Sequence, residues 1–209
     1  LWSELASLLA GDAAEGARRR GWKAVALLGV AVALAVTLYG RGAPERELKD
    51  AIERSDHAQA ALLADRLLAQ HPDDADLKSQ ATEAALKAHV PTWLAQLRAG
   101  DFEGATRVLG AISRLAVRNP ELRALVGELE WLGQLDQLVS ARGGAQAPIR
   151  IYVDEAGIEA VIARWNDNTS EHQRALARIA AHVPQFAVPY GEALTHLRKL
   201  QSDATVHLA

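Results

Sequence analysis

The sequence GDFEGA at residues 100–105 stands 45 positions after a similar sequence, SDHAQA, at residues 55–60. In both stretches a small residue precedes an aspartate, and an alanine follows the aspartate by four positions. Gly100 can end a helix in the left-handed conformation, and the carboxylate of Asp101 can cap the helix that follows. Both stretches therefore predict a tight turn between two helices.

The alanines at the ends of these stretches, Ala60 and Ala105, predict close helix packing. An alanine lacks the methylene groups that would hold two helices apart. A larger residue at Ala60 is expected to overpack this contact.

Helical periodicity extends outward from both turns, from Pro44 to about Arg142. Pro72 and Pro120 interrupt the pattern, as expected between helices. Residues 120–142 predict one long helix, because apolar residues recur there at spacings of three and four. These residues are Leu122, Leu125, Val126, Leu129, Leu132, Leu135, Leu138 and Val139.

The two turns resemble the second half of a tetratricopeptide unit, over roughly residues 44–130. In that family a small–Asp–aromatic turn starts the second helix, an alanine packs at the closest approach, and a proline closes the unit. The residues that carry the resemblance are Asp56, Ala60, Pro72, Gly100, Asp101, Phe102 and Ala105. The resemblance implies a right-handed stack of helix pairs whose concave face binds peptides or partner proteins.

The match departs from the family in two respects. The spacing of 45 residues exceeds the family period of 34, and Trp93, Leu94 and Leu97 stand out of register with the first half of the motif. We therefore expect a degenerate repeat of two units within residues 44–142, with a third helical hairpin beginning at Pro120 as an extension and an ordinary helical bundle as the alternative.

Residues 147–209 are expected to form a C-terminal segment of one strand plus helices. Ile149, Ile151 and Val153 alternate with polar residues, which predicts an isolated β-strand over residues 147–153. Such a strand needs a partner, for example by strand addition to another protein; an extended linker is the alternative. The helices after it either pack on the repeat or form a small second domain.

A run of sixteen residues without charge, Ala24 to Tyr39, predicts a transmembrane helix over residues 21–41. Aromatic and basic residues flank the run as membrane anchors. These residues are Arg18, Arg19, Arg20, Trp22, Lys23, Tyr39 and Arg41. A buried core helix and a cleaved signal peptide are the alternatives. Residues 1–20 are expected to be a cytosolic juxtamembrane segment that ends a longer upstream part.

The cluster of three arginines before the run favours a cytoplasmic N-terminus. In a bacterium this places the helical part in the periplasm, on a single-pass protein of the inner membrane.

Composition excludes several kinds of chemistry. The chain has 209 residues, a formal net charge of -3, 49% hydrophobic residues and no cysteine. Disulfides, thiolate metal sites and cysteine nucleophiles are therefore excluded, and no general basic surface supports nucleic-acid binding. The seven histidines are scattered without metal-ligand spacing, and no phosphate-binding loop or nucleophile motif is present. We predict no catalytic residue, metal or cofactor, and a protein that is not an enzyme.

The expected fold is mainly α: a transmembrane helix, a tetratricopeptide-like helical-hairpin repeat, one isolated β-strand and a C-terminal helical segment. The expected function is a non-enzymatic membrane scaffold or adaptor in a membrane-spanning assembly such as a secretion or pilus machine. Its partners would be other membrane or envelope proteins and the lipid bilayer. Association of the chain into a homo-oligomer is a further alternative. The candidate partner-binding residues are Trp93, Ile149, Ile151 and Val153.

Two other functions stay open at this point. The chain is alternatively the anchor and sensor of a longer signalling receptor or kinase. It is alternatively a membrane-tethered periplasmic chaperone, which would bind many unfolded clients weakly.

Overall fold

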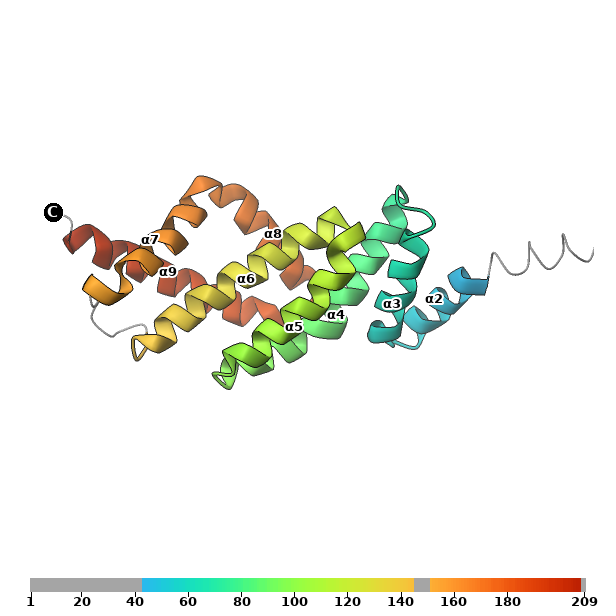
Figure 1. Ribbon diagram of the computed structural model, residues 1–209, viewed down its shortest axis with the longest axis horizontal. Helices are drawn as coiled ribbons and strands as arrows, with labels where there is room; N and C mark the ends of the chain where they lie inside the picture. Colours follow the sequence, from blue (N-terminus) through green and yellow to red (C-terminus); the bar gives the residue numbers. More distant parts are fainter. Residues whose placement is uncertain (1–42, 145–150, 208–209) are drawn as a thin grey trace, which may run out of the picture. The chain divides into compact units, whose positions relative to one another are not determined.

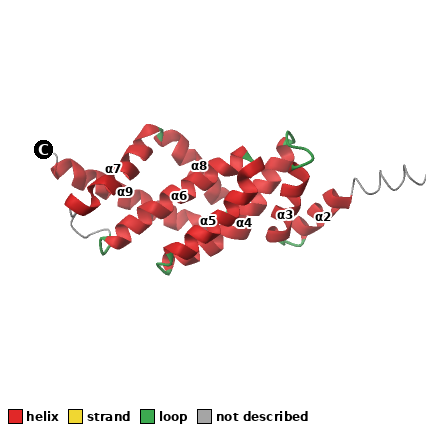
Figure 2. Cartoon of the chain, in the orientation of Figure 1, coloured by secondary structure: helices red, strands yellow, loops and turns green. Residues whose placement is uncertain are grey.

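The computed structural model describes residues 43–144 and 151–207, and all of the regular structure in these two ranges is helical (Figures 1 and 2). The helices are α2 (Ala43–Glu53), α3 (His57–Leu68), α4 (Ala75–Arg98), α5 (Phe102–Leu115), α6 (Pro120–Ala141), α7 (Ile151–Asp167), α8 (Thr169–His182) and α9 (Ala187–His207). Two short 3₁₀ helices, η1 (Ala116–Arg118) and η2 (Pro184–Phe186), lie between them. The chain divides into compact units at residues 47 and 48, and the packing below is that of the second unit.

Side-chain caps fix where α3 to α6 begin. Asp56 accepts a hydrogen bond from the amide of Gln59 at 3.1 Å, and Asp101 accepts one from the amide of Gly104 at 2.8 Å. Asp74 and Asn119 cap α4 and α6 in the same way. Each cap satisfies one of the amides that a helix start leaves without a partner.

These caps repeat in register. Asp101 stands 45 positions after Asp56, and Asn119 stands 45 positions after Asp74. The pair α3–α4 and the pair α5–α6 therefore begin at equivalent points of one sequence period. We call them the first and the second repeat unit.

The turns before the two units are equivalent as well. Ser55 has φ +58° and Gly100 has φ +71°. The amide of Asp56 donates to the Ala51 carbonyl and that of Asp101 to the Gln96 carbonyl, each at 2.9 Å. This is the left-handed helix ending predicted at Gly100, and a serine adopts it at the first turn.

Small residues are buried at equivalent positions of the two units. Ala60 is fully buried, and Ala105 at the equivalent position of the second unit is 3% exposed. In this part of the molecule α3 packs on α4, and α4 packs on both α5 and α6 (Figure 1). The chain is thus helical, as expected, and consistent with a helical-repeat fold. The two turns stand before the helix pairs defined here, whereas the tetratricopeptide resemblance places each turn within a unit, at the start of its second helix.

The C-terminal helices complete the core of the second compact unit. Helices α7, α8 and α9 all contact α6, and α8 and η2 also contact α4. Trp131 of α6 stacks on Trp165 of α7, with ring centroids 5.1 Å apart. Phe186 of η2 is fully buried beside Trp93 of α4.

The predicted strand at residues 147–153 is wrong where the structure describes it. Ile151 and Val153 lie in α7, whereas Ile149 lies outside the described residues. A lone strand leaves its backbone groups without partners, but a helix pairs its own. The apolar stripe that continues at Ile158, Val161 and Trp165 is buried, and it favours a helix across the whole segment.

The transmembrane helix in the expected fold class also needs correction. Within residues 43–144 and 151–207, no helix is both long enough and apolar enough to cross a bilayer. The long helices α4, α6 and α9 carry charged residues along their length. The predicted span at residues 21–41, with its anchor residues, lies outside the described residues. The fold that the structure describes is helical only.

Candidate functional site

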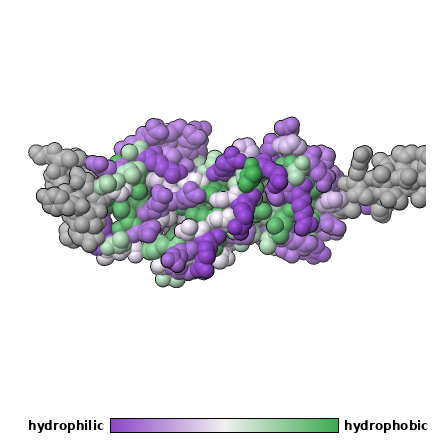
Figure 3. Space-filling view, in the orientation of Figure 1, coloured by the Kyte–Doolittle hydropathy of each residue, from purple (hydrophilic) through white to green (hydrophobic). Residues whose placement is uncertain are grey.

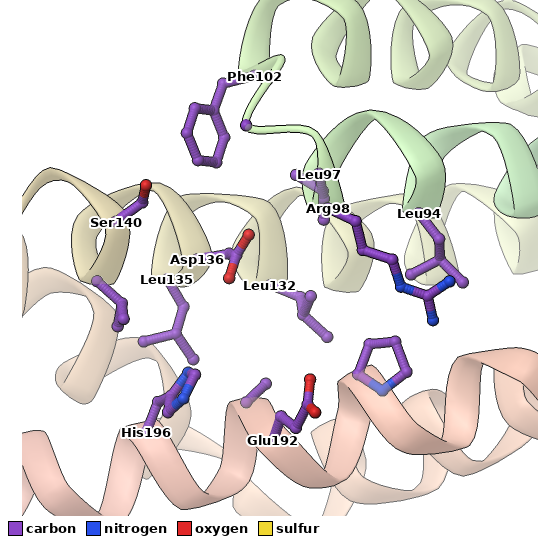
Figure 4. Close-up of a pocket in the computed structure, with 14 residues that line it drawn as sticks. Leu94, Leu97, Arg98, Phe102, Leu132, Leu135, Asp136, Ser140, Glu192 and His196 are labelled. Carbon is purple, nitrogen blue, oxygen red and sulfur yellow. The ribbon is translucent and has the colours of Figure 1, made fainter. Parts of the chain in front are cut away.

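A groove with a cavity of about 300 Å³ opens between α4, α6 and α9 (Figure 4). We call it the α4–α6–α9 groove. Its lining consists of Leu94, Leu97, Arg98, Gly100, Phe102, Leu132, Leu135, Asp136, Val139, Ser140, Pro189, Glu192, Ala193 and His196. The groove therefore joins the repeat units to the C-terminal helices, which lie far apart in the sequence.

The floor of the groove is apolar. Leu94 and Leu97 come from the last turns of α4, and Leu132, Leu135 and Val139 come from one stripe of α6. All of them are at most 8% exposed. Because α4 ends in the turn at Gly100, the half-buried ring of Phe102 reaches the same groove from the start of α5.

Four ionisable side chains surround this floor. Arg98 comes from α4, Asp136 from α6, and Glu192 and His196 from α9. In Figure 4 the carboxyl groups of Asp136 and Glu192 reach into the cavity from opposite helices. Among the described residues, none of the four forms a hydrogen bond or an ion pair with another side chain.

The electrostatics of Asp136 reflect this lack of a partner. Burial raises the pKa of the Asp136 carboxyl, the nearby His196 lowers it, and the negative charge of Glu192 raises it again. The net direction is upward, so His196 does not compensate for burial. Among the described residues, the attraction of His196 offsets the effects of burial and of Glu192 on an ionised Asp136 only in part.

A second cluster of polar side chains lies between α6 and α8, and its members form hydrogen bonds within the protein. Nδ1 of His172 lies 2.9 Å from both carboxylate oxygens of Glu128, and its Nε2 lies 2.8 Å from the carbonyl of Arg164. Arg164 in turn donates to the Gly127 carbonyl at 2.6 Å. Because both imidazole nitrogens are engaged, neither is left for a substrate. The group fastens α7 and α8 to α6.

Two further hollows lie beside α5. One, of about 310 Å³ between α4, α5 and α6, is lined by Trp93, Gly133 and Gln134 among others. The indole N–H of Trp93 is buried there and has no hydrogen-bond partner among the residues that the structure describes. The other, about 410 Å³, contains His89, whose pKa is lowered by burial. Neither hollow brings several charged groups together as the α4–α6–α9 groove does.

The residues predicted from the sequence lie in different places: at the groove, in the buried core and in an exposed loop. Gly100 and Phe102 line the groove, and Asp101 caps α5 beside it. Trp93 is fully buried and has no exposed surface for a partner. Pro72 lies in the exposed loop between α3 and α4. Ala60 and Ala105 are buried in the core.

Sequence reasoning missed the charged rim of the groove. Asp136 stands directly after Leu135 and one helical turn after Leu132, so it interrupts an apolar stripe. A carboxylate at such a position is a signal that the sequence offered. Glu192 and His196 lie four positions apart on one helix, but only the fold brings them opposite Asp136.

On the face shown in Figure 3, hydrophilic residues are interrupted by hydrophobic ones. The large hydrophobic side chains with most exposure, Leu62, Val117 and Val188, lie on separate elements. Among the described residues, no group of three or more histidines and carboxylates could hold a metal ion. The α4–α6–α9 groove is therefore our candidate site.

We found no match to this chain among protein families, curated proteins or solved structures.

Proposed function

We propose that the helical unit is a protein-docking module, a non-enzymatic scaffold or adaptor that holds a partner protein in the α4–α6–α9 groove. The observation that carries the proposal is the groove itself: a buried apolar floor surrounded by four ionisable side chains, none of which forms a hydrogen bond or an ion pair with another side chain among the described residues. Protein interfaces combine an apolar centre with a polar rim in the same way. The partners would be components of a multiprotein assembly.

The repeat architecture supports the same proposal. We propose that α3–α4 and α5–α6 are two units of a degenerate, tetratricopeptide-like repeat. Their 45-residue register lies nearer to the longer helix-pair repeats, whose units run to about 40–47 residues, than to a period of about 34. Stacked helix pairs of either length present extended surfaces that bind proteins.

Site-specific crosslinking tests this proposal. A photoreactive residue replaces Phe102, which lines the groove, in the 209-residue chain produced in its native host. The control carries the same residue at Ala124, which is exposed on α6 and does not line the groove. We expect one discrete crosslinked protein from Phe102 and none from Ala124.

The identified protein is then purified and its affinity is measured by calorimetry. Ser140→Trp fills the exposed end of the groove and is expected to abolish binding at an unchanged thermal midpoint, whereas Ala124→Trp leaves binding intact. Equal crosslinking at both positions contradicts docking in the groove. Equal competition by generic unfolded peptides contradicts a dedicated scaffold, because a chaperone binds many clients.

A further inference from the structure

We infer that the α4–α6–α9 groove accepts an amphipathic peptide segment of a partner protein, with a lysine or arginine cation between Asp136 and Glu192 and leucine-like side chains on the floor. This inference rests on the proposed docking function. It adds the chemistry of the segment that docks.

The carboxylates of Asp136 and Glu192 indicate that the ligand carries a positive charge. Asp136 and Glu192 project from α6 and α9 into one cavity, and within the part of the chain that the structure describes no cation lies in hydrogen-bond contact with either. Their mutual repulsion contributes to the raised pKa of Asp136. An ammonium or guanidinium group placed between them would form charge-assisted hydrogen bonds with both and would relieve that repulsion.

The positive residues of the groove leave this position open. Figure 4 shows Arg98 extending away from Asp136, toward the end of the groove at Leu94. His196 lies beside Asp136 on α9 and attracts its charge only partly, as the net direction of the Asp136 pKa shows. Among the described residues, a ligand cation would therefore compete with His196 alone for Asp136, and it would replace no hydrogen bond of either carboxylate.

The volume of the cavity and its apolar floor indicate the size of the ligand and the apolar side chains that it carries. About 300 Å³ is at the small end of the range for ligand pockets, roughly 300–1,000 Å³, and suits a few side chains rather than a large cofactor. The leucine floor from α4 and α6 matches apolar side chains next to the cation. An amphipathic segment supplies both on one face.

Charge argues against polyanionic occupants. A nucleic-acid strand or an anionic lipid would bring phosphates against Asp136 and Glu192, at a cost for each like-charge contact. A partner protein with a basic residue in an apolar stretch meets no such cost.

Three synthetic probes test the inference. They are fluorescent peptides of leucine and alanine that differ at one central residue, which is lysine, norleucine or glutamate. Norleucine keeps the lysine stem without its charge. By fluorescence polarisation on the intact chain, we expect the lysine peptide to bind about tenfold more tightly than the norleucine peptide, the worth of one charge-assisted hydrogen bond. The glutamate peptide is expected to bind most weakly.

The double variant Asp136→Asn, Glu192→Gln removes both charges with little change of shape. We expect it to bind the lysine and norleucine peptides equally. The control Glu159→Gln, Asp167→Asn removes the same number of charges from exposed positions of α7 that do not line the groove. It is expected to keep the tenfold preference. The preference should also decrease as salt is added.

The outcomes separate this inference from the proposed function. Equal affinity of the lysine and norleucine peptides, with both blocked by Ser140→Trp, overturns the inference and leaves docking in the groove intact. A preference for the glutamate peptide would assign Arg98 as the charged contact and also overturns it. Binding of no peptide, together with no crosslink at Phe102, overturns both.

Discussion

Glu83 and Glu128 occupy the same position of the two repeat units, 45 residues apart, yet they have opposite surroundings. The Glu83 side chain is 46% exposed and pairs with Lys87 on its own helix; this hydrogen bond lowers the pKa of Glu83. The Glu128 side chain is 10% exposed and pairs with His172 of α8. The comparison shows that one repeat position faces solvent in the first unit, whereas the second unit uses it to fasten the C-terminal helices.

The largest expected effect comes from breaking the buried pair. His172→Leu leaves Glu128 buried without its partner, and this should lower the free energy of unfolding by about 3–5 kcal/mol. Glu83→Gln should cost less than about 1 kcal/mol, because its pair is exposed. Urea unfolding followed by circular dichroism measures both.

A double replacement tests the cause of that loss. Glu128→Met combined with His172→Leu should recover most of the stability, because it removes the buried charge as well. If His172→Leu alone behaves like Glu83→Gln, the contrast between the two units is not electrostatic.

The second effect contrasts the caps of α6 and α4. Asn119 is fully buried, caps α6, and donates from Nδ2 to the Lys78 carbonyl and the Thr82 hydroxyl, each at 2.9 Å. Asn119→Ala should cost about 2–3 kcal/mol, because it removes the acceptor of the buried Leu122 amide together with both hydrogen bonds to α4. Asp74→Ala removes only a cap and should cost about 1 kcal/mol. Equal losses would show that the bonds from Asn119 to α4 contribute nothing.

The third effect concerns the buried alanines that the two units share. Ala60→Leu and Ala105→Leu should each lower the free energy of unfolding by about 1–3 kcal/mol through overpacking. Ala58→Leu, at an exposed position of α3, is the control and should change little. An unchanged thermal midpoint in Ala60→Leu would contradict close packing of α3 on α4.

The fourth effect exchanges the residues at the two equivalent turns. Ser55→Gly should raise the free energy of unfolding by about 0.5–1 kcal/mol, since glycine adopts a positive φ without strain. Gly100→Ser should lower it by about 1 kcal/mol. A Cβ at Gly100 meets no atom within 4 Å, so the change reports backbone strain alone. Shifts of the same sign would show that the turns are not equivalent.

The smallest effect lies at Asp136, whose equivalent in the first unit is the uncharged Pro91. The pKa of Asp136 is raised above its ordinary 3.8, so the folded state holds this proton more strongly than the unfolded state. Its contribution to stability is therefore present at low pH and is lost as pH rises through the folded-state pKa.

Asp136→Asn removes this dependence. It should raise the thermal midpoint slightly at pH 7, by a gain of at most about 0.5 kcal/mol, and the gain should vanish below about pH 3.8. Glu192 and His196, whose charges act on the same carboxyl, are left unchanged. A lower midpoint at pH 7 would mean that an ion pair holds Asp136.

The sequence was sufficient for local features of the fold. The turns at residues 55–60 and 100–105 were predicted because capping and left-handed endings depend on residues a few positions apart. The buried stripe of α6 followed from its periodicity in the same way. The strand prediction failed because three alternating apolar residues do not distinguish a strand from the start of a helix.

The candidate groove depends on contacts across long separations in the sequence. Phe102 was predicted for packing, and the structure places it at a groove with Asp136 and Glu192. No spacing rule relates Asp136 to Glu192, because α7 and α8 lie between them in the chain. Burial of Trp93 likewise depends on Phe186, which packs over it from η2.

The stacking of Trp131 on Trp165 provides a spectroscopic signal for the packing of α7 on α6. Two indoles 5.1 Å apart and inclined by 21° couple electronically, and such a pair contributes to the near-ultraviolet circular dichroism only while the rings are held together. Because one ring belongs to α6 and the other to α7, this signal follows the attachment of the C-terminal helices separately from total helix content. Partial detachment would thus be visible in a spectrum before the helices themselves unfold.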